Sequence, residues 1–270
     1  MRTTESASLY DGLDKMTTFE ILQDINNEDK MVPEAITGSI PQIEKLVDAI
    51  VERNGRVFYM GAGTSGRIGI TDASEILPTY GVGDKFIGII AGGDGAIRTP
   101  VEGAEDDPVQ GWEDLKAFDP TPADTLIGIS ASGGAPYVLG AIQEARAHGL
   151  LTSCITCNEG SPMEEASEIP IVTVVGPEFV TGSTRMKSGT AAKLILNMIS
   201  TAVMIRLGHV KGNKMVDMQL SNSKLVDRGT RMIMQETGLA DYAAAKSLLL
   251  THGSVRMAVQ AYKNKGTDKA

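Results

Sequence analysis

Five short stretches of the chain are apolar at almost every position, and they restrict the fold more than any other feature of the sequence. They are rich in Ile and Val and do not alternate between apolar and polar residues. Strands that are covered on both faces have this pattern, which is typical of a parallel sheet. The predicted strands are 56–60, 86–91, 125–130, 152–157 and 171–175.

Helical periodicity fills much of the chain between and around these strands. Two helices are predicted before the first strand, at 17–37 and 41–53, and two more after later strands, at 135–148 and 184–207. Two or three short helices are predicted within 229–265. Pro33 is expected to interrupt or restart the first helix. The pattern predicts an α/β fold: a doubly wound, five-stranded parallel sheet flanked by helices, with N-terminal helices and a small helical C-terminal region. The expected domains are 1–40, 41–228 and 229–270.

Composition excludes several classes of protein. The chain has 25 Lys and Arg against 34 Asp and Glu, a formal charge of −9, so a nucleic-acid partner is not expected. Two Cys in 270 residues argue against a disulfide scaffold and for a reducing compartment. The polar N-terminus does not resemble a signal peptide. The apolar stretch 191–208 is broken by Lys193, Asn197 and Arg206, which predicts a buried helix and no membrane span. We expect a cytoplasmic protein.

Three strands are followed by loops of small and hydroxyl-bearing residues that precede helices. In a parallel sheet the carboxyl ends of the strands meet at one edge, where ligands bind. Free N–H groups and helix dipoles favour an anion there, although Ser and Thr also serve as ordinary helix caps. The loops predict a phosphate site formed by Thr64, Ser65, Ser130, Ser132, Ser183 and Thr184.

Two other motifs are weaker. Gly61-x-Gly63-x-x-Gly66 fits the dinucleotide fingerprint, but no acidic residue ends the next strand and Asp94 comes only after Gly92-Gly93. Cys154 and Cys157 fall on a predicted strand, where residues three apart point to opposite faces. Neither nicotinamide nor a metal is therefore expected, and the three scattered His residues give no metal-ligand spacing.

Two glutamates are candidates for acid–base chemistry. Glu75 comes at the end of the helix after the first loop, and Glu105 lies with Glu102 in an acidic segment after the second strand. A Glu can act as general acid or base when its surroundings shift its pKa towards neutrality. The alternative for both positions is a solvated acidic turn.

The motifs together resemble the sugar isomerase (SIS) domain, which is also found in the glucokinase regulatory protein. Within that class the chain resembles the N-acetylmuramic acid 6-phosphate etherase family from about residue 5 to residue 237. The resemblance rests on the segments 25–30, 61–67, 72–75, 78–81, 91–93, 101–106, 180–187 and 212–217.

This resemblance implies a lyase that cleaves the D-lactyl ether of N-acetylmuramic acid 6-phosphate. The products are N-acetylglucosamine 6-phosphate and D-lactate, in the recycling of cell-wall sugars. It implies Glu75 as the acid and Glu105 as the base, with no cofactor and no metal. The six hydroxyl residues would hold the 6-phosphate, with Gly63, Gly133 and Lys187 as additional contacts.

Ten residues separate Ser65 from Glu75, about 15 Å along a regular helix. A hexose phosphate spans about half of that, so we expect a homodimer in which Glu75 reaches the partner's site at the subunit interface. SIS proteins place their sites in a similar position. Two other functions stay open: a sugar-phosphate-binding regulator without catalysis, and an aldose–ketose phosphosugar isomerase.

Overall fold

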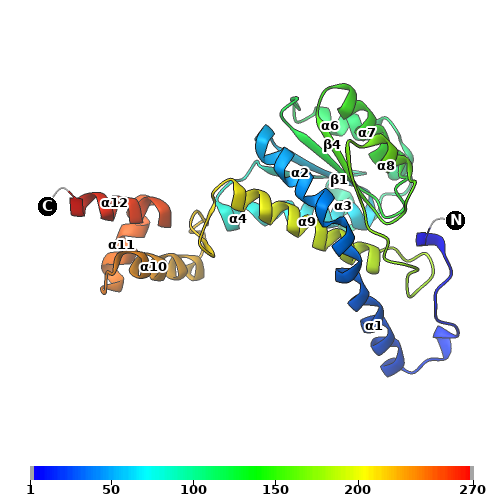
Figure 1. Cartoon of the computed structure of the whole chain (residues 1–270), viewed down its shortest axis with the longest axis horizontal. Coiled ribbons are helices and arrows are strands. Elements are labelled where there is room, and N and C mark those ends of the chain that lie inside the picture. The colour runs from blue at the N-terminus through cyan, green and yellow to red at the C-terminus, as the bar shows by residue number, and fades with distance from the viewer. Residues whose placement is uncertain (1–2, 268–270) are drawn as a thin grey trace. The chain divides into compact units, whose positions relative to one another are not determined.

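The computed structural model describes residues 3–267 and divides into two compact units (Figure 1). The first unit contains the residues up to Ser74 together with Lys85–Val203. The second contains Glu75–Asp84 and the residues from Met204 onward.

The first unit is built on a five-stranded parallel sheet in the order β2-β1-β3-β4-β5. The predicted fold class is thereby confirmed. The last strand begins two residues earlier than expected, because Ile169 to Val172 pair with Ser153 to Thr156 of the preceding strand. The strands are β1 (Val57–Gly61), β2 (Phe86–Ile90), β3 (Thr125–Ile129), β4 (Leu151–Thr156) and β5 (Ile169–Val172).

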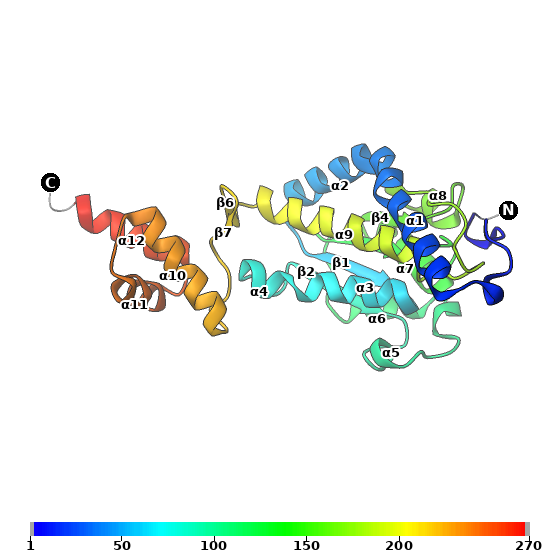
Figure 2. The same cartoon turned by 90° about the horizontal axis from the view of Figure 1, so that it is seen from below.

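Helices cover both faces of this sheet, which explains why the strands are apolar throughout (Figures 1 and 2). On one side lie α2 (Ile40–Arg53), α3 (Gly63–Ser74) and α9 (Lys187–Arg206); on the other lie α6 (Gln110–Lys116), α7 (Pro136–Ala147) and α8 (Pro162–Ala166). Phe58, Met60 and Leu126 are fully buried in the core beneath α6 and α7. The short elements of this unit are η1 (Thr3–Glu5), η2 (Leu13–Lys15), η3 (Thr37–Ser39), α5 (Gly95–Arg98) and η4 (Ala104–Asp106).

Helix α1 (Thr18–Ile36) continues through Pro33, so the predicted interruption is wrong. Proline removes only its own N–H donor, and in the last turn of a helix few further bonds depend on it. The start of α1 is fixed by a capping box in which the Thr17 hydroxyl accepts from the Glu20 N–H and the Glu20 carboxylate accepts from the Thr17 N–H.

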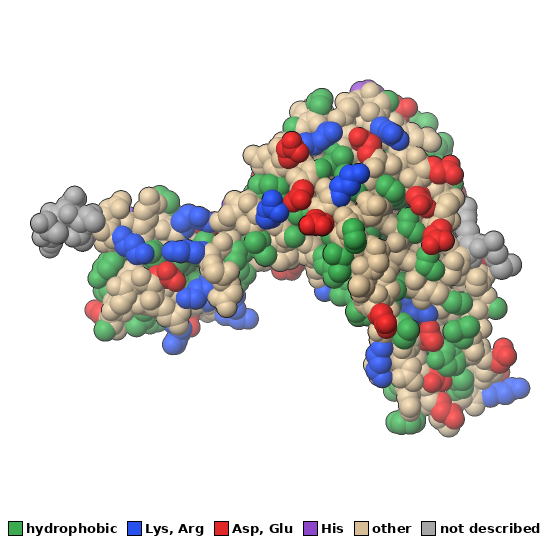
Figure 3. Space-filling view, in the orientation of Figure 1, with side chains coloured by type: hydrophobic (Ala, Val, Ile, Leu, Met, Phe, Trp, Pro, Cys, Tyr) green, Lys and Arg blue, Asp and Glu red, His purple; other side chains and the backbone are tan. Residues whose placement is uncertain are grey.

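Helix α9 is long and apolar enough to cross a membrane by length and composition alone, with a mean hydropathy of 1.3. Yet 56% of its most apolar window is buried inside the protein, and Asn197 on this helix donates a hydrogen bond to Asp72 of α3 at 2.5 Å. The structure therefore supports the prediction of a buried helix. Acidic and basic side chains are mixed over the face of the first unit seen in Figure 3.

The second unit has its own small core. It comprises α4 (Ile76–Tyr80), an antiparallel pair of strands β6 (Val210–Lys211) and β7 (Lys214–Met215), and the helices α10 (Ser223–Thr237), α11 (Tyr242–His252) and α12 (Val255–Thr267). Ile233, Leu249 and Ala258 are buried where the three long helices meet. Helix α10 begins six residues before position 229, so the expected boundary at 228/229 falls inside it.

Replacing Gly140 with alanine is expected to lower the free energy of unfolding by about 1–3 kcal/mol, the usual effect of overpacking. The added Cβ would lie 1.8 Å from the carbonyl oxygen of Pro108. Chemical denaturation measures the effect. The matched control is Gly38→Ala, where no atom lies within 4 Å of the added Cβ. Its stability should stay within about 0.5 kcal/mol of wild type, and equal stabilities for the two variants would contradict the packing argument.

Candidate active site

The site begins at the junction between β1 and α3, where the strand turns directly into the helix. A Cβ on Gly61 would lie 2.6 Å from the backbone nitrogen of Gly66, and a Cβ on Gly66 would lie 2.6 Å from Cγ1 of Ile90. Only glycine fits at these two positions. The close approach brings the N-terminus of α3, with Thr64 and Ser65, to the carboxyl edge of the sheet, where the helix dipole favours an anion.

A cavity of about 320 Å³ lies at this edge, within the size range of small-molecule sites. It is lined by residues that follow β1, β3 and β4 and by the start of α9. Five of the six predicted hydroxyl residues line it, and so do the predicted base and one predicted glycine. They are Thr64, Ser65, Ser130, Ser132, Thr184, Glu105 and Gly63.

The second loop is ordered by its own contacts. The hydroxyl oxygens of Ser130 and Ser132 lie 3.2 Å apart, and Ser132 Oγ accepts from the Gly134 N–H at 3.3 Å. Gly133 is not among the residues that line the cavity. It is buried with φ +67°, and an added Cβ would lie 2.4 Å from Ser161. Because Gly133 has no side chain, the loop can pack closely against Ser161 at the start of α8.

The third loop differs from expectation. Ser183 lies outside the cavity lining and Thr184 within it, and α9 begins at Lys187, three residues later than predicted. The N-terminus of α9 is capped by the buried carboxylate of Glu178. This carboxylate accepts from the Lys187 N–H at 2.8 Å, from the Ser188 N–H at 2.9 Å and from the Ser188 hydroxyl at 2.8 Å. A protein carboxylate thus occupies the anion position of this helix.

Lys187 is also placed differently from the prediction. Its side chain is buried, its ammonium is paired with Glu28 of α1, and it does not line the cavity. Glu28 also accepts a hydrogen bond from the Tyr10 hydroxyl at 3.1 Å. The charge of Lys187 therefore ties α9 to α1.

The two predicted catalytic glutamates lie in different units. Glu105 is exposed in η4 and lines the cavity, and its carboxylate has no partner among the residues that the structure describes. Glu75 belongs to the second unit, where it precedes α4; it too is exposed and unpaired within residues 3–267. The cavity is lined by residues of the first unit.

Among the lining residues with polar or ionisable side chains, sequence reasoning missed three: Glu5, Cys157 and Ser188. Glu5 arrives from the N-terminal segment, which is held by Asn158 through two hydrogen bonds with Thr4, of 3.3 and 2.9 Å. No spacing in the sequence relates Glu5 to the loops, because the contact spans more than 150 residues.

Cys154 and Cys157 are both free thiols with different surroundings. Cys154 packs in the core beneath α7, whereas Cys157 lines the cavity. Burial raises the pKa of each thiol to about 11, so both stay protonated at neutral pH. A thiol in that state is a poor nucleophile.

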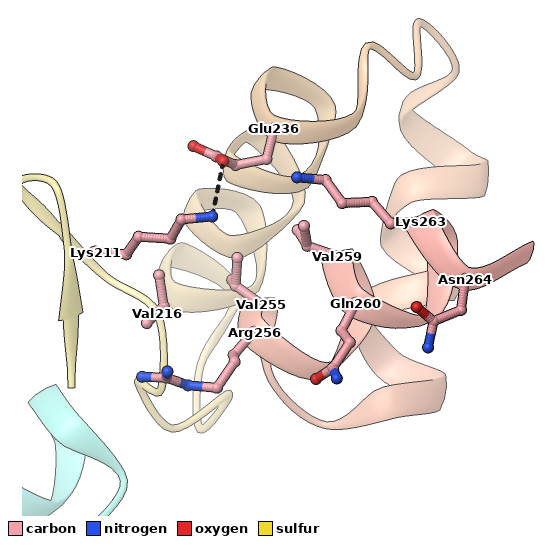
Figure 4. Close-up of a pocket in the computed structure, with 9 residues that line it drawn as sticks. All are labelled: Lys211, Val216, Glu236, Val255, Arg256, Val259, Gln260, Lys263 and Asn264. Atoms are coloured by element: carbon pink, nitrogen blue, oxygen red, sulfur yellow. Dashed lines mark ion pairs between the residues drawn. The ribbon is translucent and has the colours of Figure 1, made fainter. Parts of the chain in front are cut away.

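The second unit contains a groove of about 380 Å³ among its helices (Figure 4). Two of its three cationic side chains are paired with carboxylates: Lys211 with Glu236 at 3.5 Å, and Arg256 with Asp217 at 2.6 Å. Three valines line much of the rest, namely Val216, Val255 and Val259. The groove lacks the hydroxyl loops of the first unit and is not a candidate for the same chemistry.

Comparisons with known proteins identify the family. Residues 40–146 match the family model of the glucokinase regulatory protein N-terminal SIS domain. A protein of Porphyromonas gingivalis named N-acetylmuramic acid 6-phosphate etherase is 59% identical over 272 residues, covering 99% of each chain. The chain belongs to the N-acetylmuramic acid 6-phosphate etherase family. A Bacteroides fragilis protein of the same name is 61% identical over 267 residues, covering 97% of this chain and 95% of that protein.

Solved structures show that this etherase-family chain shares its fold with phosphosugar isomerases. A phosphoheptose isomerase from Neisseria gonorrhoeae covers 69% of this chain and 99% of its own, with a TM-score of 0.54 and 14% identity. At that identity the likeness establishes the fold alone.

Proposed function

We propose that this protein cleaves the D-lactyl ether of N-acetylmuramic acid 6-phosphate, giving N-acetylglucosamine 6-phosphate and D-lactate. The name shared by relatives about 60% identical over nearly the whole chain supports this reaction. The single structural observation that carries it is the cavity that Glu105 lines together with the hydroxyl loops. A cytoplasmic role in cell-wall sugar recycling follows from the same assignment.

The phosphate is held by hydroxyl and backbone donors. Thr64 and Ser65 open α3, whose dipole favours the anion, and Ser130, Ser132 and Thr184 face the same cavity. Ser183 adjoins this group. In the proposed arrangement the phosphate lies against these loops, and the sugar extends toward Glu105, which lines the same cavity.

The chemistry is an elimination followed by addition of water. Opening of the sugar ring makes C1 an aldehyde, which acidifies the proton on C2. Glu105 removes that proton, the bond between C3 and the ether oxygen breaks, and Glu75 protonates the departing lactate oxygen. Water then adds at C3 of the unsaturated aldehyde, and a proton returns to C2. One water is consumed and no electrons are exchanged with a cofactor.

The position of Glu75 leads to a shared site. It directly follows the last residue of α3, and twelve helical residues rise by about 18 Å from the cavity end. We therefore place Glu75 in the site of a partner subunit within a two-fold homodimer. Its exposure and its unpaired carboxylate in the single chain support this arrangement.

Wild-type protein should release D-lactate from N-acetylmuramic acid 6-phosphate, and Glu105→Gln should lower kcat by about 10²–10⁴-fold, the usual contribution of a general base. Enzymatic assay of D-lactate measures both, and the matched control is Asp106→Asn, an exposed carboxylate of the same short helix that lines neither this cavity nor its neighbour. A folded wild type that binds the sugar phosphate without releasing lactate would overturn the lyase assignment in favour of a regulator. Conversion of an aldose phosphate to a ketose phosphate would favour an isomerase.

Mixing inactive Glu75→Ala and Glu105→Ala subunits should restore activity if each site takes one glutamate from each subunit. Random exchange gives half mixed dimers, each with one intact site, so about a quarter of wild-type activity is expected. Subunit exchange is checked with differently tagged chains. Absence of recovery after confirmed exchange would place both groups in one chain, and Glu5→Gln would then test the other carboxylate in the cavity.

A further inference from the structure

A second, smaller cavity of about 170 Å³ adjoins the phosphate cavity. The two share Ala62, Gly63 and Glu105 in their linings. The smaller one is completed by Arg67 in the second turn of α3 and by the segment 100–104. All of its lining residues belong to the first unit. Glu105 therefore stands at the border between two spaces.

Arg67 is held in place by neutral groups. Its Nε donates to the carbonyl oxygen of Ile97 at 2.9 Å, and its Nη2 donates to that of Ala96 at 2.8 Å. Within residues 3–267 no carboxylate forms an ion pair with it, and Nη1 has no hydrogen-bond partner. Nη1 lies 4.0 Å from the position that a Cβ would occupy on Gly63. The guanidinium is thus fixed in direction while its charge is not neutralised by a partner.

Arg67 is the one cationic side chain among the described residues that line either cavity. The other charged lining residues are acidic: Glu5 and Glu105 in the larger cavity, Glu102 and Glu105 in the smaller. The proposed phosphate site consists of hydroxyl groups and the N-terminus of α3, which can bind the phosphate without a cationic side chain. If the ligand carries a second anionic group besides the phosphate, Arg67 is the one cation among the described lining residues that can pair with it.

We propose that Arg67 binds the carboxylate of the lactyl group and that the smaller cavity is the lactyl site. This assignment rests on the proposed function. Glu105 takes the proton from C2, and the ether is borne by the adjacent carbon, C3. Because Glu105 borders both cavities, a sugar whose phosphate lies in the larger one brings its C3 substituent to the smaller. A planar guanidinium fixed by two carbonyls is well suited to a carboxylate, since little freedom is lost on binding.

The proposal makes Arg67 a residue that determines specificity. It should strengthen binding of sugar phosphates that carry an acidic 3-ether and contribute little to those that lack one. It also explains how a site with two nearby glutamates accepts a substrate with two anionic groups.

A cycle that changes both protein and ligand tests the contact. Binding is measured by calorimetry in the Glu105→Gln background, which prevents turnover. The ligands are N-acetylmuramic acid 6-phosphate and its lactyl carboxamide. With Arg67 present, the change from carboxylate to carboxamide should weaken binding by about 10- to 100-fold, as expected for a charged hydrogen bond. With Arg67→Gln added, the two ligands should differ by less than about 3-fold.

N-acetylglucosamine 6-phosphate, which lacks the lactyl group, separates this role from others. Its affinity should be unchanged by Arg67→Gln. The matched control is Arg98→Gln, because Arg98 is an exposed cation of the adjacent α5 that lines neither cavity; this variant should bind all three ligands with wild-type affinity. An equal loss of affinity for all three ligands in Arg67→Gln would overturn the proposal. It would mean that Arg67 binds the phosphate, or that it only supports the backbone at residues 96–97. Absence of lactate release by wild type would refute the lyase function while leaving this binding cycle readable.

Discussion

The contact between the backbones of Gly61 and Gly66 is the constraint on which the site depends. A single methyl group at either position would collide with backbone or with Ile90, so β1 and α3 can meet this closely only through glycine. The junction places Thr64 and Ser65 at the edge of the sheet. It also fixes everything further along the helix: Arg67 comes one turn later, and Glu75 follows the last residue at the far end. The proposed phosphate site and the proposed sharing of Glu75 between subunits both depend on where this helix starts.

Charge in the site is distributed unevenly. The proposed phosphate cavity has donors without cations, whereas the fixed cation lies in the adjoining space. Potential competitors for the phosphate are engaged elsewhere: Lys187 is paired with Glu28, and the N-terminus of α9 is occupied by Glu178. Under the proposed assignment, this division gives the phosphate and the carboxylate of one ligand different partners. Such a division orients the ligand as well as holding it.

Local pattern was enough to predict the sheet and most of the hydroxyl loops. Strands buried on both faces have a strong signature, and parallel topology alone brings their carboxyl ends to one edge. The predictions failed where a residue far along the chain determines the outcome. Nothing near Lys187 indicates that Glu28 neutralises it, and nothing near Glu5 indicates that Asn158 holds its segment beside the cavity. The start of α9 was misplaced because its cap, Glu178, lies nine residues before it. In the sequence Arg67 appears only as part of a motif. Its orientation depends on the carbonyls of Ala96 and Ile97, which bind Nη2 and Nε and leave Nη1 without a partner among the described residues.

The central claim is elimination through an open-chain sugar with loss of the C2 proton to Glu105. The most direct test is to run the reaction in D₂O and, separately, in ¹⁸O-labelled water, and to analyse both products by mass spectrometry and NMR. Solvent deuterium is expected at C2 of the sugar and the water oxygen at C3, while lactate should keep the original ether oxygen. A product that retains its C2 proton together with lactate that carries the solvent oxygen would contradict it, because cleavage would then occur on the lactyl side of the ether.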